Sequence, residues 1–292
     1  MTHDIIPDSE LIINSDGSVF HLHILPGKLA HNIILVGDPG RVDMVSSMFD
    51  EVTYTAENRE FRSATGKYKG KEITCVSTGI GTDNIDIVLT ELDALVNVDF
   101  NTRKVKEKKT SLNIVRIGTS GSLQKDLDVD SWLLSQTAIG FDPVLNFYAD
   151  RDKAVDKGME EAFYKFMNWN PQMGAPYIIN ADEDVLNRFK NNPNVHLGTT
   201  ISAPGFYGPQ GRVVRLPLAV PDINDRLPLF EYQGKKITNY EMECSAIYAL
   251  SKLLGHKAAT ICIIIANRQA GTASKDYKPG MTQLVKHVLE NF

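Results

Sequence analysis

The chain has 292 residues, of which 42% are hydrophobic and 23% are charged, and its formal net charge at pH 7 is −5. This composition is typical of a globular protein and excludes a disordered or fibrous chain. The acidic balance argues against nucleic acid as a partner, because a nucleic-acid backbone requires a basic face. The length favours one domain over residues 19–292, preceded by an N-terminal extension over residues 1–18.

The sequence predicts a cytoplasmic protein with no membrane partner. The extension carries several acidic residues and no apolar core of signal-peptide length, and no apolar run approaches the length of a membrane span. The three cysteines lack Cys-x-x-Cys spacing, which favours reduced core thiols over a disulfide framework; they are Cys75, Cys244 and Cys262.

Alternating strand and helix patterns predict the fold class. Runs rich in isoleucine, valine and threonine predict strands at 32–36, 71–77, 112–117, 132–140, 195–202 and 257–266. The last run is apolar on both faces, as in a central strand of a mainly parallel sheet. Apolar residues at helical spacing predict helices at 42–49, 85–96 and 242–253. We therefore expect an α/β fold with a mixed central sheet flanked by helices.

The segment 37–41 follows the first predicted strand, at the sheet edge where ligands of α/β folds gather. Asp38 suits a helix N-cap and Pro39 suits the first helical position. Arg41 adds a guanidinium beside the free backbone N–H groups, so this segment is suited to bind phosphate. The alternative is an ordinary turn with a solvated arginine.

Arg116 interrupts the apolar strand at 112–117, where a guanidinium is costly unless it is paired or bound to an anion. Gly118, Thr119 and Gly121 follow it and offer close backbone approach and a hydroxyl donor. The segment 78–82, which is rich in glycine and threonine, directly follows the predicted strand 71–77. Phosphate binding and an internal salt bridge are both open for Arg116.

Two carboxylates, Glu241 and Glu243, stand at the start of the predicted helix 242–253. They are two residues apart, so they point to different faces and only one is expected to enter a site. The helix dipole favours a carboxylate in the first turn, which explains the presence of Glu241 without a role in binding. Glu243 lies among apolar positions and is suited to accept hydrogen bonds from the vicinal diol of a sugar.

The segment 206–212 combines groups that suit a heterocyclic base. Phe206 offers a ring for stacking, and Gln210 with Arg212 fits an edge that carries carbonyl and N–H groups. A surface turn is the alternative. The segment 103–109 is interpreted as a solvated basic loop and the segment 216–228 as an irregular insertion. The segment 269–274 is interpreted as a closing lid.

Together these segments resemble the uridine phosphorylases of the nucleoside phosphorylase superfamily, over nearly the whole chain from Val19. The matching segments are 19–22, 37–41, 58–61, 77–81, 116–121, 206–212, 240–243 and 267–268. The resemblance implies a single nucleoside phosphorylase domain that catalyses reversible phosphorolysis of uridine to uracil and ribose 1-phosphate. It implies no cofactor, and we expect no metal ion.

The resemblance also implies a role for each site residue. Phosphate would be held by Gly37, Arg41, Arg116 and Thr119, with Arg59 donated by a neighbouring subunit. Ribose would be held by the backbone of Met242 and the side chain of Glu243, with His21 from the neighbour. The base would be held by Phe206, Gln210, Arg212, Arg268, Ser120 and Gly121. The residues expected to carry catalysis are Arg41, Arg116, Glu243 and Arg212.

Departures from the family pattern bear on the substrate. Purine phosphorylases and nucleosidases of the superfamily place an aspartate after the last strand to protonate the base, whereas this chain has Asn267. An amide cannot be that acid, which favours a pyrimidine leaving as an anion. Bacterial members often carry a serine where this chain has Asn84, at a dimer-interface position associated with a monovalent cation, so the resemblance is not extended to that ion. The base-binding segment has Gly208-Pro209 where Pro-Gly is commoner.

The family pairs subunits to complete each site, and its bacterial members form hexamers, so a homo-oligomer built from dimers is implied. The alternatives for function are a purine nucleoside phosphorylase or nucleosidase of the same superfamily, and a non-catalytic nucleoside-binding protein.

Overall fold

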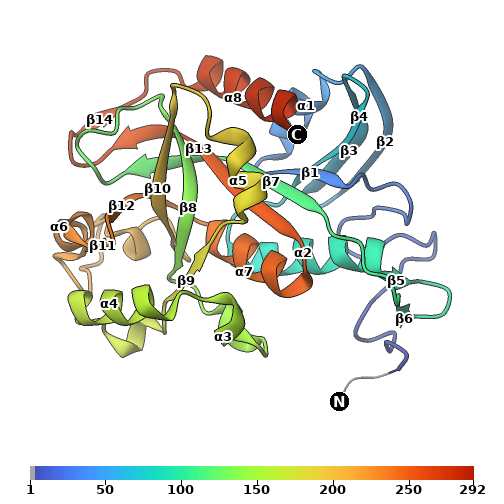
Figure 1. Ribbon diagram of the computed structural model, residues 1–292, viewed down its shortest axis with the longest axis horizontal. Helices are drawn as coiled ribbons and strands as arrows, with labels where there is room; N and C mark the ends of the chain where they lie inside the picture. Colours follow the sequence, from blue (N-terminus) through green and yellow to red (C-terminus); the bar gives the residue numbers. More distant parts are fainter. Residues whose placement is uncertain (1–3) are drawn as a thin grey trace.

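The computed structural model describes residues 4–292, so residues 1–3 of the predicted extension lie outside the described part. Within it, one twelve-stranded sheet forms the centre, with the path β11-β12-β10-β8-β13-β7-β1-β4-β3-β2 (Figure 1). Two further strands join it, because β14 pairs with β13 and β9 pairs with β8. The strands are β1 (Asn32–Val36), β2 (Glu51–Asn58), β3 (Phe61–Tyr68), β4 (Lys71–Ser77), β7 (Asn113–Ser122), β8 (Trp132–Gly140), β9 (Tyr177–Asn180), β10 (Val195–Ser202), β11 (Glu231–Tyr232), β12 (Lys235–Glu241), β13 (Lys257–Asn267) and β14 (Thr272–Ala273).

The six predicted strands are confirmed as β1, β4, β7, β8, β10 and β13. Of these, β13 lies parallel to β7 and antiparallel to β8, so the sheet is mixed. The hairpin of β2 and β3 and the strand β12 were not predicted. The side chains of β2 are mostly exposed, and β12 is largely polar, so neither shows the apolar run that marks a buried strand.

One pairing closes part of the sheet on itself. β12 lies parallel to β10 and also pairs antiparallel with β7, through Asn239 opposite Ser122 and Tyr240 opposite Gly121. The strands β7, β13, β8, β10 and β12 therefore form a closed ring. This closure places the end of β12, with Glu241, beside the strand that carries Arg116.

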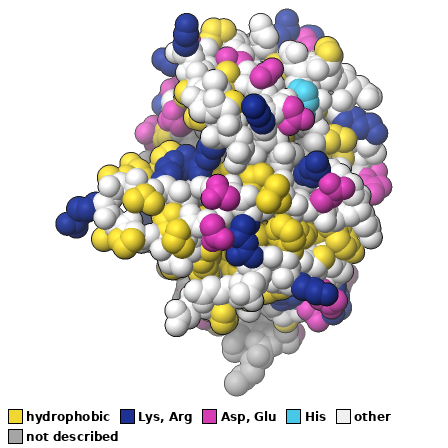
Figure 2. Space-filling view, turned by 90° about the vertical axis from the view of Figure 1, so that its left-hand side faces the viewer, with side chains coloured by type: hydrophobic (Ala, Val, Ile, Leu, Met, Phe, Trp, Pro, Cys, Tyr) yellow, Lys and Arg dark blue, Asp and Glu magenta, His cyan; other side chains and the backbone are white. Residues whose placement is uncertain are grey.

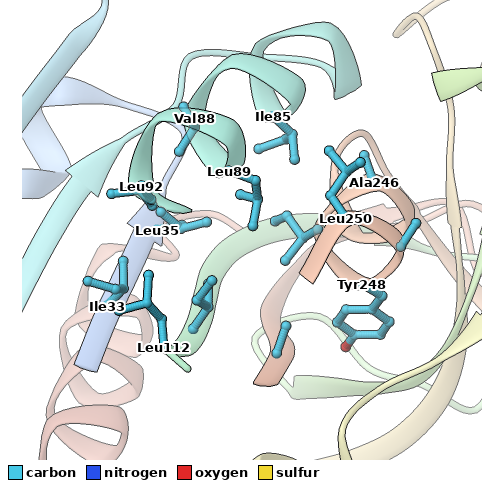
Figure 3. Packing of buried hydrophobic residues seen from close by; sticks show 14 of the residues in the cluster. Ile33, Leu35, Ile85, Val88, Leu89, Leu92, Leu112, Ala246, Tyr248 and Leu250 are labelled. Atoms are coloured by element: carbon cyan, nitrogen blue, oxygen red, sulfur yellow. The ribbon is translucent and has the colours of Figure 1, made fainter. Parts of the chain in front are cut away.

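Helices cover both faces of the sheet (Figure 1). α2 and α7 pack on one face, and α1, α5 and α8 on the other. In Figure 3, Leu89 of α2 and Leu250 of α7 lie together beside Leu35 of β1, and all three are buried. The α-helices are α1 (Pro39–Ser46), α2 (Thr82–Asn97), α3 (Arg151–Ala154), α4 (Lys157–Met167), α5 (Glu183–Phe189), α6 (Ile223–Arg226), α7 (Cys244–Leu254) and α8 (Lys278–Asn291), with 3-10 turns at Val144–Phe147, Pro171–Met173, Gly208–Gln210 and Leu227–Leu229.

The predicted helix 242–253 begins two residues later than expected, because Glu241 is the last residue of β12 and α7 starts at Cys244. The predicted insertion 216–228 is not wholly irregular, since it contains α6 and part of a 3-10 turn. The segment 269–274 turns back on β13 through β14, whose two residues are exposed.

The basic segment 103–109 was interpreted as a solvated loop, and this is wrong for its first residues. Lys104 and Val105 form β6 (Lys104–Val105), which pairs with β5 (Val98–Asp99). The Arg103 guanidinium donates to the carbonyls of Ile6 at 2.7 Å and Leu11 at 2.6 Å. It therefore fastens the N-terminal extension to the domain.

No helix between residues 4 and 292 combines the length and the apolar character needed to cross a bilayer. Figure 2 views the side of the molecule that carries α6 and β11. Basic and acidic side chains are interspersed over it, with apolar groups between them, rather than gathered in a basic stripe.

Candidate active site

The segment 37–41 forms the helix start that its sequence predicts. Asp38 is the N-cap of α1 and accepts a hydrogen bond from the Gly40 N–H at 2.9 Å, while Pro39 begins the helix. The Arg41 side chain reaches the middle of β7, where it donates to the Ile117 carbonyl at 3.5 Å. Burial and the nearby charge of Arg116 lower the pKa of Arg41. Two guanidiniums thus approach one another, an arrangement that an anion between them would stabilise.

Arg116 is 5% exposed and lies among buried partners. It forms an ion pair with Glu243, and its Nη1 lies 3.5 Å from Glu241 Oε2 and donates to Cys262 Sγ at 3.5 Å. Burial would lower the pKa of Arg116, but the two carboxylates raise it, so the guanidinium stays charged. The internal salt bridge is therefore present. Within residues 4–292, Arg116 Nε has no hydrogen-bond partner, so the guanidinium keeps a donor for a ligand.

The expectation that only one of the two carboxylates would enter the site is wrong, because both face Arg116. The expectation assumed helical periodicity, whereas Glu241 ends a strand and Glu243 precedes the helix. Glu243 Oε1 also accepts the Gly81 N–H at 2.8 Å, which ties it to the start of α2. Met242 lies between the two carboxylates and is half-buried.

The loops that follow β1 and β4 lie against each other, and β7 pairs with β1 along its other edge. The Thr78 N–H donates to the Val36 carbonyl at 2.8 Å, and a Cβ on Gly37 would lie 3.5 Å from the Gly79 carbonyl. Thr119 and Gly121 at the end of β7 are half-buried. Ser120 is buried, and within the described chain its hydroxyl has no partner. The β4 loop is linked to Arg116 through Gly81 and Glu243, and Thr119 and Ser120 add hydroxyl groups on the strand that carries Arg116.

A second cluster gathers around Gln210, which is 3% exposed. Its Oε1 accepts from Arg212 Nη1 at 2.6 Å and from Arg268 Nη2 at 2.9 Å. The Arg212 guanidinium lies 3.7 Å from the centre of the Phe206 ring, and that of Arg268 lies 4.9 Å from the Tyr240 ring. Burial and the charge of Arg212 lower the pKa of Arg268 to about 10, so it is still charged at neutral pH. Phe206 remains 51% exposed, which leaves ring surface for a ligand.

Asn267 is fully engaged in holding the loop after β13. Its amide nitrogen donates to the carbonyls of Gln124 at 2.9 Å and Leu127 at 2.8 Å, and its oxygen accepts the N–H groups of Gln269 and Ala270. The side chain is 1% exposed. Its donors and acceptors are therefore directed to the backbone rather than to a ligand.

His21 and Arg59 have no hydrogen bond or ion pair to Arg116 or Glu243 within residues 4–292. His21 Nδ1 lies 2.7 Å from Glu91 Oε1, and its ring is partly exposed. Arg59 is exposed in the turn between β2 and β3, with a left-handed φ of 54°. Both side chains thus lie at the surface of the chain.

Glu91 was not singled out in the sequence, although it is 6% exposed and accepts the backbone N–H groups of His21 and Leu22. A signal was available, because Glu91 stands three residues after Val88 and four before Leu95, on the apolar face of α2. A carboxylate on that face requires partners.

An apolar cavity of about 680 Å³ lies beside Arg212. The segment after Arg212 forms one part of its lining through Val214 and Leu216, and Phe141 and Trp169 form another. The cavity therefore adjoins the Gln210 cluster rather than the Arg116 cluster.

A scan against protein-family models matches residues 32–289 to the phosphorylase superfamily. A curated uridine phosphorylase of Thermococcus kodakarensis is 28% identical over 259 residues, which cover 87% of this chain and 79% of the relative. A curated guanosine phosphorylase of Halorubrum lacusprofundi is also 28% identical, with 89% of each chain covered.

Among solved structures, the crystal structure of a Trypanosoma brucei nucleoside phosphorylase, described as showing uridine phosphorylase activity, superposes with a TM-score of 0.86. It is 30% identical and the match covers 96% of this chain and 98% of the other.

Proposed function

Since this chain belongs to the phosphorylase superfamily, we propose that it cleaves uridine with inorganic phosphate to give uracil and ribose 1-phosphate, in pyrimidine salvage. The chain is an enzyme of the nucleoside phosphorylase class, that is, a pentosyltransferase. The choice of uridine is the proposal, because matched relatives are named for uridine and for guanosine alike.

Phosphate is assigned to the space between Arg41 and Arg116. The two guanidiniums approach each other there, and Arg116 Nε points to no partner in the described chain. Arginine donates two parallel hydrogen bonds to two phosphate oxygens, and the α1 N-terminus adds backbone N–H groups. Gly37 directly follows β1, and Thr119 lies on β7 three residues after Arg116, so both are proposed as further phosphate contacts. The nucleophile would then lie beside the carboxyl end of β1 and the middle of β7.

Ribose is assigned to Glu243 and to the backbone of Met242. Arg116 and the Gly81 N–H hold the Glu243 carboxylate, which fixes its orientation before substrate arrives. A carboxylate accepts several hydrogen bonds, so the ribose diol has acceptor positions left. Because the same carboxylate contacts Arg116, sugar and phosphate are brought to adjacent positions.

The base is assigned to the Gln210 cluster, and this cluster carries the choice of a pyrimidine. Two arginines hold one amide oxygen, so Gln210 is fixed and positive charge surrounds the base edge. Negative charge that grows on uracil as the glycosidic bond breaks is stabilised there. Uracil would stack on Phe206, with Ser120 and Gly121 beside it. Asn267, saturated by the backbone, supplies no acid for a purine.

The reaction requires no covalent protein nucleophile. Phosphate attacks the anomeric carbon as positive charge develops on the ribose, as in glycoside hydrolysis. The C–O bond to phosphate forms while the C–N bond to uracil breaks, and uracil leaves with the bonding electrons. Arg41, Arg116, Glu243 and Arg212 act by positioning and by charge, and these effects supply most of the rate.

The functional site is proposed to be shared between subunits, with His21 and Arg59 completing the site of a neighbour in a dimer-built homo-oligomer. The surface positions of both side chains support this. Arg59 lies in the tight turn between β2 and β3, so its side chain is held at the end of an exposed hairpin. A cytoplasmic setting is part of the proposal, which the unpaired thiols of Cys75, Cys244 and Cys262 support.

Incubation with uridine, thymidine and inosine, each with and without phosphate, tests the function through release of free base. We expect base release from uridine only when phosphate is present. Release without phosphate would identify a nucleosidase, and faster release from inosine than from uridine would identify a purine phosphorylase. No release under any condition would identify a nucleoside-binding protein.

A further inference from the structure

We propose that Glu241 is a positioning residue that takes up a proton when phosphate binds beside Arg116. The inference rests on the proposed function, because it takes the phosphate to lie between Arg41 and Arg116. Glu241 was assigned only a helix-dipole role from the sequence, and its contacts place it in the reacting cluster instead.

Glu241 joins the phosphate side of the site to the ribose side. Its Oε2 accepts the N–H groups of Glu243 and Cys244, each at 2.9 Å, and lies 3.5 Å from Arg116 Nη1. Its Oε1 lies 2.5 Å from the Ser202 hydroxyl. One carboxylate therefore holds both the backbone of the ribose-binding residue and the guanidinium that binds phosphate.

The charges of the cluster are balanced before phosphate arrives. Arg41 and Arg116 supply two positive charges, and Glu241 and Glu243 supply two negative ones. A phosphate dianion adds two negative charges at a buried site, and Arg59 of a neighbour offsets only one. Unpaired charge in such a place is costly, so proton uptake is favoured.

Between the two carboxylates, Glu241 is the one that accepts the proton. Both oxygens of Glu243 meet groups that can only donate, the Arg116 guanidinium and the Gly81 N–H. Oε1 of Glu241 instead meets the Ser202 hydroxyl, which can accept as well as donate, so a proton on this oxygen has a partner. Glu241 lies at the longer distance from Arg116. The proton comes from solvent and forms an O–H bond on the carboxylate, while the Ser202 hydroxyl serves as its acceptor.

The groups that face Glu241 permit titration near neutral pH. They are Arg116 from β7, Glu243 at the start of α7, and the thiols of Cys244 and Cys262. Burial raises the pKa of both thiols, so they remain neutral. Burial also raises the pKa of Glu241, to about 7, with Arg116 lowering it and Glu243 raising it further.

Sulfate is the probe for this proposal, because it is a tetrahedral dianion that does not itself titrate near neutral pH. Sulfate binding to the full chain is measured by calorimetry at pH 7.5, in two buffers of different ionisation enthalpy. The wild type is expected to take up a large part of one proton per sulfate, and Glu241→Gln none. The wild-type Kd for sulfate should rise with pH between 7 and 9, by at most about tenfold per pH unit, and should stay flat in Glu241→Gln.

Glu160 offers a matched control, since it is a buried glutamate paired with Arg151 at 2.9 Å in another part of the fold. Glu160→Gln should retain the wild-type proton uptake. If Glu241→Gln does not fold, Ser202→Ala tests the same point. It removes the hydroxyl that donates to the carboxylate in the free protein and accepts from the protonated carboxyl in the complex. The pKa of Glu241 should then differ less between the two states, so the proton uptake per sulfate should fall.

Equal proton uptake in the wild type and in Glu241→Gln overturns the inference, as does sulfate binding to the wild type with no uptake. Either result leaves the proposed function standing if uridine is still cleaved with phosphate. In contrast, sulfate binding that Arg116→Ala does not weaken would overturn the phosphate site itself.

Discussion

A Cβ atom on Gly118 would lie 1.9 Å from Arg116 Nη1, so the guanidinium occupies the space that any other residue at 118 would fill. Arg116 cannot simply move aside, because its contacts with Glu243 and Cys262 are buried. The glycine two residues along the strand therefore defines where the arginine lies.

Gly118→Ala should reduce kcat/KM for phosphate by about 100-fold, because a displacement of about 1 Å at a reacting group is enough for such a loss. Steady-state kinetics at varied phosphate measures it. Gly280→Ala in α8 is the control, since its added Cβ meets only the end of the Ile263 side chain. A Gly118→Ala enzyme with normal phosphate kinetics would show that Arg116 does not position the nucleophile.

Gln210→Glu should keep the fold and reduce kcat. A carboxylate at 210 would pair with Arg212 and Arg268 and neutralise the charge that the leaving base requires, so we expect a loss of about 100-fold to 1,000-fold in kcat. Circular dichroism and uracil release measure the two effects. The exposed Gln172→Glu serves as control. If Gln210→Glu lowered the affinity for phosphate as much as the affinity for uridine, a base-specific role of Gln210 would be contradicted.

Asn267→Asp should destabilise the protein and should not create a purine phosphorylase. The new carboxylate would face the carbonyls of Gln124 and Leu127, which now accept from the amide nitrogen. We expect the free energy of unfolding to fall by about 1–3 kcal/mol. Denaturant unfolding measures this loss, and inosine phosphorolysis should stay at the wild-type level. A gain of inosine turnover would contradict the conclusion that the side chain at 267 holds the loop after β13 and does not face the base.

Arg59→Ala and Arg116→Ala should each be nearly inactive, and co-expression of the two should restore activity. In a mixed dimer with shared sites, one site carries both substitutions and the other carries neither. Random pairing makes about half of the dimers mixed, so about a quarter of wild-type activity should return. Mixing two preparations of Arg116→Ala is the control. Absence of recovery in verified mixed dimers would place Arg59 in its own protomer's site.

The strands and helices that carry the site were largely predictable. The strands are continuous apolar runs, as expected of strands buried on both faces, and the apolar residues of the helices recur at helical spacing. β1, β4 and β10 match their predicted bounds, and α2 extends the predicted pattern at both ends. The convergence of the 37–41 and 116–121 segments followed from the rule that ligands gather at strand ends.

The side-chain contacts inside the site were less predictable than the strands and helices. That Glu241 and Glu243 both face Arg116 depends on where β12 ends, and the polar residues of β12 give no strand signal. The engagement of Asn267 with Gln124 and Leu127 depends on contacts some 140 residues apart in the chain. Sequence spacing carries no information on such long-range pairings.

The antiparallel pairing of β7 with β12 has a consequence for how specificity changes over evolution. The strand that bears Arg116 and the strand that ends at Glu241 are joined by a backbone ladder, so in the proposed reaction the spacing between nucleophile and sugar is set by the main chain. The side chains assigned to the base edge come instead from the 206–212 loop and from Arg268, and β7 contributes only Ser120 and Gly121 beside the base. Mutation can therefore rebuild base preference in loops while the bond-making geometry is inherited unchanged.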